Sequence, residues 1–188
     1  MQKTLVLGSG SWGTALALLA ARNGHLVYLW GNEPDQINEM ITSKVNTMYF
    51  PGVTLPSNIK PIVDVSLGIS EVQVIILAVP SQGFRDTLLT IKPYLRADHC
   101  LVVATKGLDP VTGCFLTDLI ESALTIPIQS SVLSGPTFAS EIVVDQPSAI
   151  TLAALSDDVA VSVTNLLHNP HFRVYRTTDI KGVQVGGA

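Results

Sequence analysis

A glycine-rich turn, Gly8-Ser9-Gly10-Ser11-Trp12-Gly13, stands between a short apolar run and an alanine- and leucine-rich segment. Each glycine meets a separate steric demand. Gly8 lets the chain leave a buried strand sharply, Gly10 lets backbone N–H groups approach a ligand, and Gly13 lets the following helix pack close to the strand. A helix that opens here also places free N–H donors and the positive end of its dipole at the turn. The pattern therefore predicts a turn that binds the pyrophosphate of a dinucleotide.

The composition fits one domain built around a buried sheet. The chain has 188 residues, of which 47% are hydrophobic and only 14% are charged. This balance favours a sheet that is covered on both faces and whose central strands are apolar throughout. The net charge of −4, with no Lys/Arg cluster, argues against nucleic-acid binding. Apolar runs are too short to insert in a membrane, and the glycine turn interrupts the one stretch that resembles a signal peptide, so we expect a cytoplasmic protein.

Apolar runs alternate with segments of helical periodicity along the whole chain. The expected strands are 5–7, 25–30, 59–63, 72–79, 101–104, 132–133, 149–152 and 172–175. The expected helices are 14–23, which Gly24 ends, 34–43, 64–69, one that Ser81 caps, 115–124 and 157–167. This alternation predicts a Rossmann-type, doubly wound α/β fold with a mostly parallel sheet and right-handed crossovers.

Ligands of such sheets bind beyond the carboxyl ends of the strands. Besides the glycine turn, the segments in that position are Asn32-Glu33, Val79-Pro80-Ser81, Thr105-Lys106-Gly107 and Gly135-Pro136-Thr137. Lys106 is their only unambiguous cation; it either binds a phosphate or carboxylate and polarises a carbonyl, or is a solvated lysine. Asn32 and Glu33 follow the strand whose tip selects NAD or NADP, but no acid stands directly at the strand end and no Arg is nearby, so the choice stays open.

No metal site is predicted. Four histidines share no ligand spacing and are expected to be structural: His25, His99, His168 and His171. Cys100 and Cys114 have neither metal nor redox spacing and are expected to be reduced, buried or half-buried thiols. Trp12 either shields the pyrophosphate or packs beneath the turn, and Phe50 is expected to close a loop over the core rather than to cover a cofactor.

Longer segments carry a resemblance to a known family. They are the glycine turn continued through Ala17, Ala21-Arg22-Asn23-Gly24-His25, Leu29-Trp30-Gly31, Ala104-Thr105-Lys106-Gly107-Leu108, Leu133-Ser134-Gly135-Pro136-Thr137-Phe138-Ala139 and Gly182-Val183-Gln184-Val185-Gly186-Gly187-Ala188. In this order they resemble the N-terminal part of bacterial NAD(P)-dependent glycerol-3-phosphate dehydrogenase over essentially the whole chain. The resemblance implies an NAD(P)-binding Rossmann domain over residues 1–180, with residues 181–188 starting a connection to a C-terminal helical domain that this chain lacks.

The resemblance also implies roles for individual residues. Together with the glycine pattern, it places the cofactor, NAD or NADP, against Gly8, Gly10, Ser11, Trp12, Gly13, Asn32, Lys106 and Ala139. It places sn-glycerol 3-phosphate against Lys106, Gly135 and Thr137. The implied reaction is hydride transfer between NAD(P)H and dihydroxyacetone phosphate, which supplies glycerol phosphate for phospholipids, and Lys106 would polarise the carbonyl and stabilise the developing alkoxide. Relatives commonly carry His or Arg where Asn32 stands, which puts a preference for NADP in doubt.

The family continues after Gly-Gly-Ala into a general acid/base lysine and a helical domain that closes over the substrate. Because this chain stops at Ala188, we expect it to bind dinucleotide but to turn over poorly or not at all alone. An apolar face without its partner domain would favour self-association, for example as a homodimer. Two alternatives stay open: a β-hydroxyacid or 6-phosphogluconate type dehydrogenase, which shares the turn, and a non-catalytic nucleotide-binding module.

Overall fold

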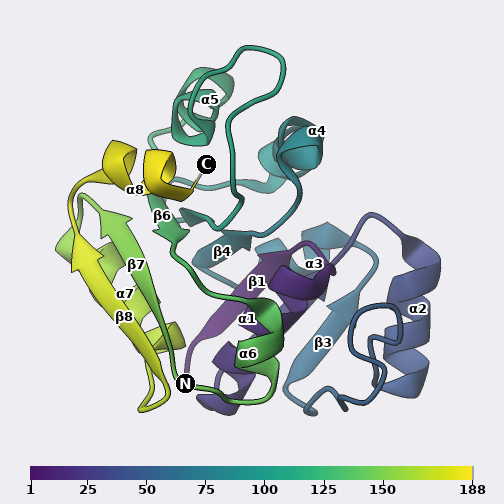
Figure 1. Cartoon of the computed structure of the whole chain (residues 1–188). Coiled ribbons are helices and arrows are strands. Elements are labelled where there is room, and N and C mark those ends of the chain that lie inside the picture. Colours follow the sequence, from purple (N-terminus) through teal and green to yellow (C-terminus); the bar gives the residue numbers. More distant parts are fainter. Residues whose placement is uncertain (188) are drawn as a thin grey trace.

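The computed structural model describes residues 1–187, which form a single eight-stranded sheet flanked by helices (Figure 1). The strands are β1 (Lys3–Leu7), β2 (Leu26–Trp30), β3 (Ile59–Ile62), β4 (Val74–Leu77), β5 (Cys100–Val103), β6 (Gln129–Ser134), β7 (Ser148–Ala154) and β8 (Phe172–Thr177). Their order across the sheet is β3-β2-β1-β4-β5-β6-β7-β8. Among these eight strands, β6 and β7 are the one pair that runs antiparallel. The predicted doubly wound, mostly parallel sheet is confirmed.

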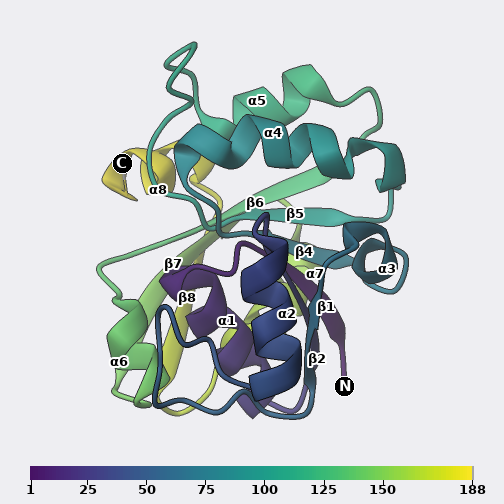
Figure 2. The same cartoon turned by 90° about the vertical axis from the view of Figure 1, so that its right-hand side faces the viewer.

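Helices cover both faces of this sheet. They are α1 (Ser11–Arg22), α2 (Pro34–Ser43), α3 (Val65–Ile69), α4 (Ser81–Ile91), α5 (Leu116–Ala123), α6 (Ala139–Val143), α7 (Asp157–Leu167) and α8 (Ile180–Gly187), with a 3₁₀ turn, η1 (Lys92–Tyr94), after α4. One apolar cluster joins α1, α2, α6 and α7 to the sheet, and the other joins α3, α4, α5 and α8 to its opposite face. Figure 2 shows α4 and α5 above the sheet and α1 and α2 below it.

β1 shows how the sequence supplies both cores. Leu5 and Leu7 belong to the cluster under α4 and α5, whereas Val6 belongs to the cluster under α1. Successive side chains of a strand point to opposite faces, so a strand buried on both faces must be apolar at every position. The continuous apolar runs in the sequence therefore predict the central strands directly.

The ends of two helices test the predicted caps. Gly24 has φ +84°, and the N–H groups of Gly24 and His25 bond to the carbonyls of Ala21 and Ala20. This is a Schellman motif, and the prediction that Gly24 ends the helix is confirmed. The predicted cap at Ser81 is wrong, because α4 begins at Ser81 itself and Pro80 stands at the N-cap with extended backbone and no capping side chain.

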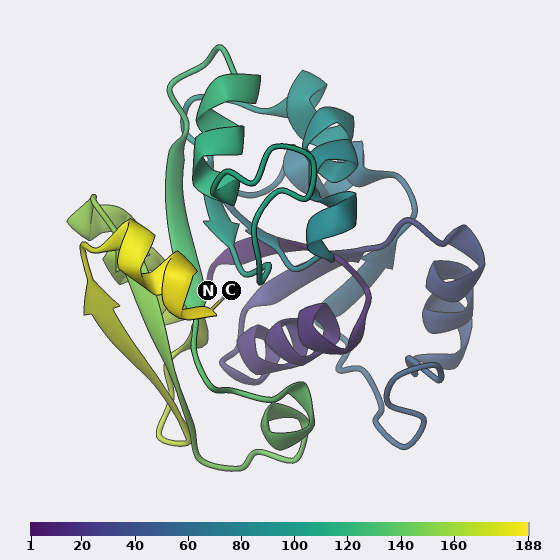
Figure 3. The same ribbon diagram turned by 45° about the horizontal axis from the view of Figure 1, so that its top comes forward.

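The strand order reverses between β1 and β4, and this reversal positions the site. The helices that follow these two strands, α1 and α4, pack on opposite faces of the sheet. They leave the carboxyl ends of β1 and β4 open to a ligand. α8 packs against β6 and β7, as the yellow helix in Figure 3 shows. α8 begins at Ile180, one residue before the predicted connection 181–188, whose last residue, Ala188, lies outside the described residues; the connecting role stays a prediction. Within residues 1–187 no helix has both the length and the apolar character that a membrane crossing requires.

Candidate dinucleotide-binding site

A cleft of about 640 Å³ opens where β1, β2, β4, β5 and β6 end. The predicted site residues that line it are Gly8, Gly10, Ser11, Trp12, Asn32, Lys106, Thr137 and Ala139. Gly13 and Gly135 do not line it. The structure therefore brings eight of the ten predicted positions to one cleft, from segments that span more than a hundred residues of sequence. Their roles stay predictions.

The three glycines of the turn occupy different environments. Gly8 has φ +117°, and a Cβ there would lie 2.6 Å from the carbonyl oxygen of Ala78 on the neighbouring chain segment. A Cβ on Gly13 would overlap the carbonyl oxygen of Gly8, so this glycine lets α1 pack against the turn. A Cβ on Gly10 would meet nothing nearer than the Tyr49 ring at 4.0 Å. Gly8 and Gly13 thus serve the packing of the backbone, while Gly10 leaves room in the cleft.

α1 begins at Ser11, three residues before its predicted start. The N–H of Thr14 bonds to the carbonyl of Gly10 at 3.0 Å, which makes Gly10 the N-cap residue. The N–H groups of residues 11–13 therefore have no partner inside the helix. Ser11 and Trp12 carry two of these N–H groups to the wall of the cleft. Together with the positive end of the helix dipole, they form a site for an anionic ligand.

A buried polar network holds the turn from beneath. The carbonyl of Ser9 accepts hydrogen bonds from Thr14 Oγ1 at 3.3 Å, Gln36 Nε2 at 3.1 Å and Asn46 Nδ2 at 2.9 Å. Asn46 also donates to Thr14 Oγ1 at 2.8 Å, accepts from Gln36 at 3.1 Å, and is only 1% exposed. Because these hydrogen bonds hold the Ser9 carbonyl oxygen on the side away from the cleft, the turn keeps its free N–H groups on the cleft side.

Sequence reasoning missed Gln36 and Asn46. Their bonds to Ser9 span 27 and 37 residues, and no local pattern shows such partners. It also missed Met48 and Tyr49, which form part of the cleft wall. The predicted position of Phe50 is confirmed, since Phe50 packs against the core and does not line the cleft.

Trp12 combines the two alternatives that the sequence left open. Its indole Nε1 donates to the carbonyl of Ala104 at 3.0 Å, beyond the end of β5. The ring packs against the apolar cluster under α1 and also lines the cleft. Trp12 therefore bridges the glycine turn and the end of β5, two strands away, and sets the floor of the cleft between them.

Lys106 projects from the end of β5. The preceding Thr105 hydroxyl is within hydrogen-bond distance of the carbonyls of Leu77 and Val79, at 3.2 and 2.8 Å, which fixes the ends of β4 and β5 together. Lys106 itself is exposed, and its amine makes no hydrogen bond or ion pair within residues 1–187. Among the described residues that line the cleft, it is the only Lys or Arg. The amine is therefore available to an anionic or carbonyl group bound there.

The loop that follows Lys106 is anchored away from the cleft. Asp109 is 1% exposed and accepts hydrogen bonds from the Thr112 hydroxyl at 2.6 Å and from the Arg85 guanidinium at 2.8 Å. The Thr112 hydrogen bond, and then Arg85, lower the pKa of the Asp109 carboxyl. This carboxylate is a loop anchor and does not line the cleft.

The segment after β6 closes the cleft. Thr137 lines it, and the Thr137 hydroxyl donates to the carbonyl of Ala149 at 2.7 Å. A Cβ on Gly135 would lie 3.3 Å from the same carbonyl oxygen, so Gly135 lets the segment lie close against β7. Gly135 therefore supports the wall from behind, while Thr137 faces the ligand space with an oxygen that can still accept a hydrogen bond.

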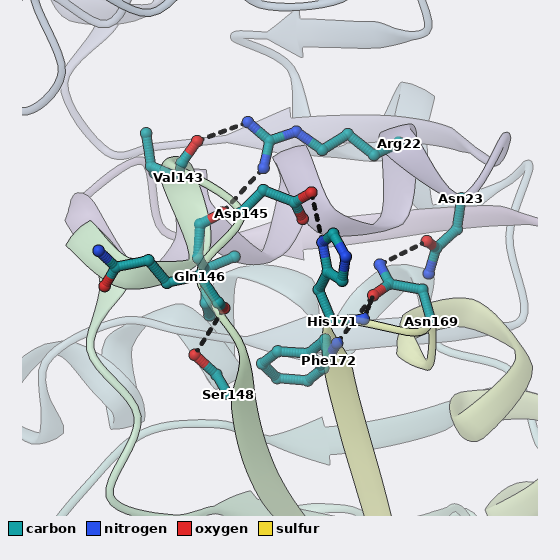
Figure 4. Close-up of polar contacts among 10 residues, drawn as sticks. Arg22, Asn23, Val143, Asp145, Gln146, Ser148, Asn169, His171 and Phe172 are labelled. Carbon is teal, nitrogen blue, oxygen red and sulfur yellow. Dashed lines mark hydrogen bonds and ion pairs between the residues drawn. The ribbon is translucent and has the colours of Figure 1, made fainter.

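The four histidines lie away from the cleft lining, each bonded to its own surroundings. The backbone N–H groups of Gln2, Arg96 and Val174 donate to the rings of His25, His99 and His168. The ring of His171 lies 2.7 Å from the Asp145 carboxylate, in a polar cluster at the far end of α1 (Figure 4).

In that cluster, Arg22 donates to the carbonyls of Ile142 and Val143 at 2.8 and 2.6 Å, and Asn169 donates to Asn23 (Figure 4). These bonds tie α6 and the start of β8 to the end of α1. Arg22 stands eleven residues beyond Ser11, or about 17 Å along the helix from the glycine turn. The cluster is thus part of the scaffold of the sheet.

The fold agrees with comparisons to known proteins. The family model described as the N-terminus of NAD-dependent glycerol-3-phosphate dehydrogenase matches residues 3–160. The chain belongs to this family. The glycerol-3-phosphate dehydrogenase (NAD(P)+) of Nitrosococcus oceani is 42% identical over 186 residues, which are 99% of this chain and 54% of the relative. The corresponding protein of Bacillus mycoides is 39% identical over 190 residues, covering 100% of this chain and 56% of the relative.

Solved glycerol-3-phosphate dehydrogenases share the fold. The crystal structure of the enzyme from Coxiella burnetii superposes with a TM-score of 0.94 at 34% identity, covering 99% of this chain and 57% of that one. The chain spans about half the length of the curated relatives it matches. The match to the glycerol-3-phosphate dehydrogenase family confirms the resemblance stated from the sequence.

Proposed function

We propose that this chain is the dinucleotide-binding part of an enzyme that interconverts sn-glycerol 3-phosphate and dihydroxyacetone phosphate with NAD(P), in the supply of glycerol phosphate for phospholipids. Family membership and the activity in the relatives' names support the proposal. The observation that carries it is the unpaired Lys106 amine, which faces the same cleft as the free N–H groups at the start of α1. One feature suits a dinucleotide, and the other suits a phosphorylated ketone.

The described residues fit a dinucleotide. Gly10 leaves space where a side chain would stand, and the N–H groups of Ser11 and Trp12 suit a pyrophosphate. Trp12 and Ala104 close the floor toward the end of β5. When bound, the nicotinamide supplies the hydride donor or acceptor, and the protein supplies orientation and electrostatics.

Lys106 would bind and polarise the substrate. Its ammonium attracts the substrate phosphate or the carbonyl oxygen, and it stabilises negative charge that develops on that oxygen. The Thr137 hydroxyl has its hydrogen committed to Ala149, so it would accept a hydrogen bond from a substrate hydroxyl. Gly135 would act indirectly, because it lets this segment lie close to β7.

Binding measurements test the proposal on the chain itself. NADH titration, followed by nicotinamide fluorescence, should show binding, and a glycerol 3-phosphate titration of the chain loaded with NAD⁺, the cofactor form that pairs with this substrate, should show a second site. Lys106→Ala should weaken glycerol 3-phosphate binding by about tenfold to a hundredfold, as expected for a hydrogen bond to a charged group. NADH binding should stay mostly intact if Lys106 chiefly serves the substrate, and should weaken if its contact with the cofactor dominates. Lys92→Ala is the matched control, because Lys92 lies outside the cleft and bonds to the carbonyl of Ala123.

An absence of NADH binding up to millimolar concentrations would remove the proposal. Equal glycerol 3-phosphate binding by Lys106→Ala and Lys92→Ala would leave the dinucleotide site but remove Lys106 from the substrate site. Homodimer formation is a separate expectation, which sedimentation velocity of the chain tests.

A further inference from the structure

The tip of β2 lies directly beside the glycine turn. The N–H of Gly8 bonds to the carbonyl of Trp30 at 2.8 Å, and a Cβ on Gly31 would overlap the Ser9 hydroxyl. The next two residues, Asn32 and Glu33, are exposed and line the cleft. A ligand whose pyrophosphate sits at the turn therefore places its adjoining ribose against these two side chains.

Asn32 and Glu33 have free hydrogen-bonding capacity. Glu33 is the N-cap residue of α2, but its side chain makes no capping hydrogen bond. Within residues 1–187, neither side chain makes a hydrogen bond or an ion pair. Their neighbour Gln36, by contrast, bonds to both Ser9 and Asn46. The tip thus offers a carboxylate and an amide, which suit the hydroxyls of a ribose diol.

Cations are distant from this tip. A ribose that carries a 2′-phosphate needs an Arg or Lys beside it. Lys106 is the only cation in the described cleft lining, and it follows β5, three strands from β2, or about 14 Å away at the usual strand spacing. Lys60 pairs with Tyr28 within β3, two residues before that strand ends, and does not line the cleft. Lys44 stands at the opposite end of α2.

Besides the glycine turn beside it, the start of α2 is a feature of this tip that would attract a phosphate. Its dipole favours an anion at this end. However, Glu33 at the N-cap and Asp35 in the first turn already place two carboxylates there. The carboxylates carry full charges and the dipole only a partial one, so the field at the tip is repulsive to a further anion.

We infer that Glu33, assisted by Asn32, determines the cofactor specificity of this cleft and makes it select NAD(H) over NADP(H). The inference rests on the proposed function, because a dinucleotide must occupy the cleft. Glu33 accepts hydrogen bonds from the free 2′-hydroxyl of NAD(H) and repels the 2′-phosphate of NADP(H). Glu33 and Lys106, the only acid and the only base among the described lining residues, thus face the two opposite ends of the ligand.

Parallel titrations of the chain with NADH and NADPH, both followed by nicotinamide fluorescence, test this inference. The wild type should bind NADH at least about tenfold more tightly than NADPH. Glu33→Gln should reduce that ratio to about threefold or less, and Glu33→Arg should bring it below one. Glu121→Gln is the control: it removes the same charge from α5, outside the cleft lining and away from the start of α2, and should keep the wild-type ratio within about twofold.

Salt supplies a second measurement. Raising the salt from about 20 to about 200 mM should lower the wild-type ratio, because it screens the repulsion, and should leave the ratio of Glu33→Gln nearly constant. Equal or tighter binding of NADPH by the wild type would overturn the inference and leave the proposed function standing. A ratio in Glu33→Gln equal to that of the wild type would overturn the assignment to Glu33. Binding of neither dinucleotide would overturn the proposed function, and the inference with it.

Discussion

Asn46→Ala tests whether the buried network beneath the glycine turn holds the turn in its binding conformation. Asn46 lies in the loop after α2, yet its side chain is almost fully buried under Ser9. It donates to Ser9 and to Thr14, and it accepts from Gln36. The substitution removes all three hydrogen bonds and adds no atom.

The expected loss of stability follows from these three bonds. Each is worth about 1 kcal/mol net, so their removal should cost about 3 kcal/mol, or about 1 kcal/mol where a water fills the vacated space. For a chain of this length, about 3 kcal/mol corresponds to a fall in Tm of roughly 6 to 12 °C. NADH affinity should fall by about tenfold, because the released turn occupies its binding conformation only part of the time.

Urea unfolding and NADH titration measure the two effects separately. Asn58→Ala is the matched control, since Asn58 donates to the carbonyls of Ala21 and His25, at 2.8 Å each, far from the turn. It should lower stability by about 2 kcal/mol and leave NADH affinity unchanged. If Asn46→Ala lowers stability but binds NADH like the wild type, the network does not hold the turn in its binding conformation, and the reasoning is refuted.

Two further predictions concern packing and pH. Alanine favours a helix over glycine by about 1 kcal/mol. Gly13→Ala should nevertheless lower the stability measured by urea unfolding, because its Cβ would overlap the Gly8 carbonyl. Gly83→Ala in α4 should raise that stability, since a Cβ there meets nothing within 4 Å. Burial raises the pKa of the Cys100 thiol to about 11, so at about pH 8 iodoacetamide should modify Cys114 and leave Cys100 unmodified until unfolding, as mass spectrometry of peptides would show. Destabilisation by both alanines, or equal labelling of both thiols, would contradict these expectations.

Much of the fold is encoded locally and is therefore legible in the sequence. The predicted bounds 34–43 and 157–167 coincide with α2 and α7. Pro34 suits the first turn of α2. The Ser156 hydroxyl caps α7, since it accepts a hydrogen bond from the N–H of Val159 at 3.4 Å. One or two local residues therefore determine where each of these helices starts. The direction of β7 is different, because its antiparallel pairing with β6 depends on how the connecting segment 135–147 packs.

The candidate site divides in the same way. Lys106 and Asn32 could be predicted because both follow apolar runs, and parallel strands bring their carboxyl ends to one edge. Asn46 and Tyr49 could not, since a loop asparagine that becomes 1% exposed looks the same in sequence as a solvated one. The missed residues reach the turn only through tertiary packing.

This division explains why glycine spacing alone is weak evidence for a function. Gly8 and Gly13 satisfy backbone contacts that any tight strand-to-helix turn would impose, and a turn of this kind need not bind anything. What directs its N–H groups to a ligand is the Ser9 carbonyl, held below by Gln36 and Asn46. Under the proposed function, what would distinguish one ligand from another is the charge at either end of the cleft, with Glu33 beside β2 and Lys106 beyond β5. We therefore expect specificity to lie at strand ends far apart in sequence, with the glycine turn as the common anchor between them.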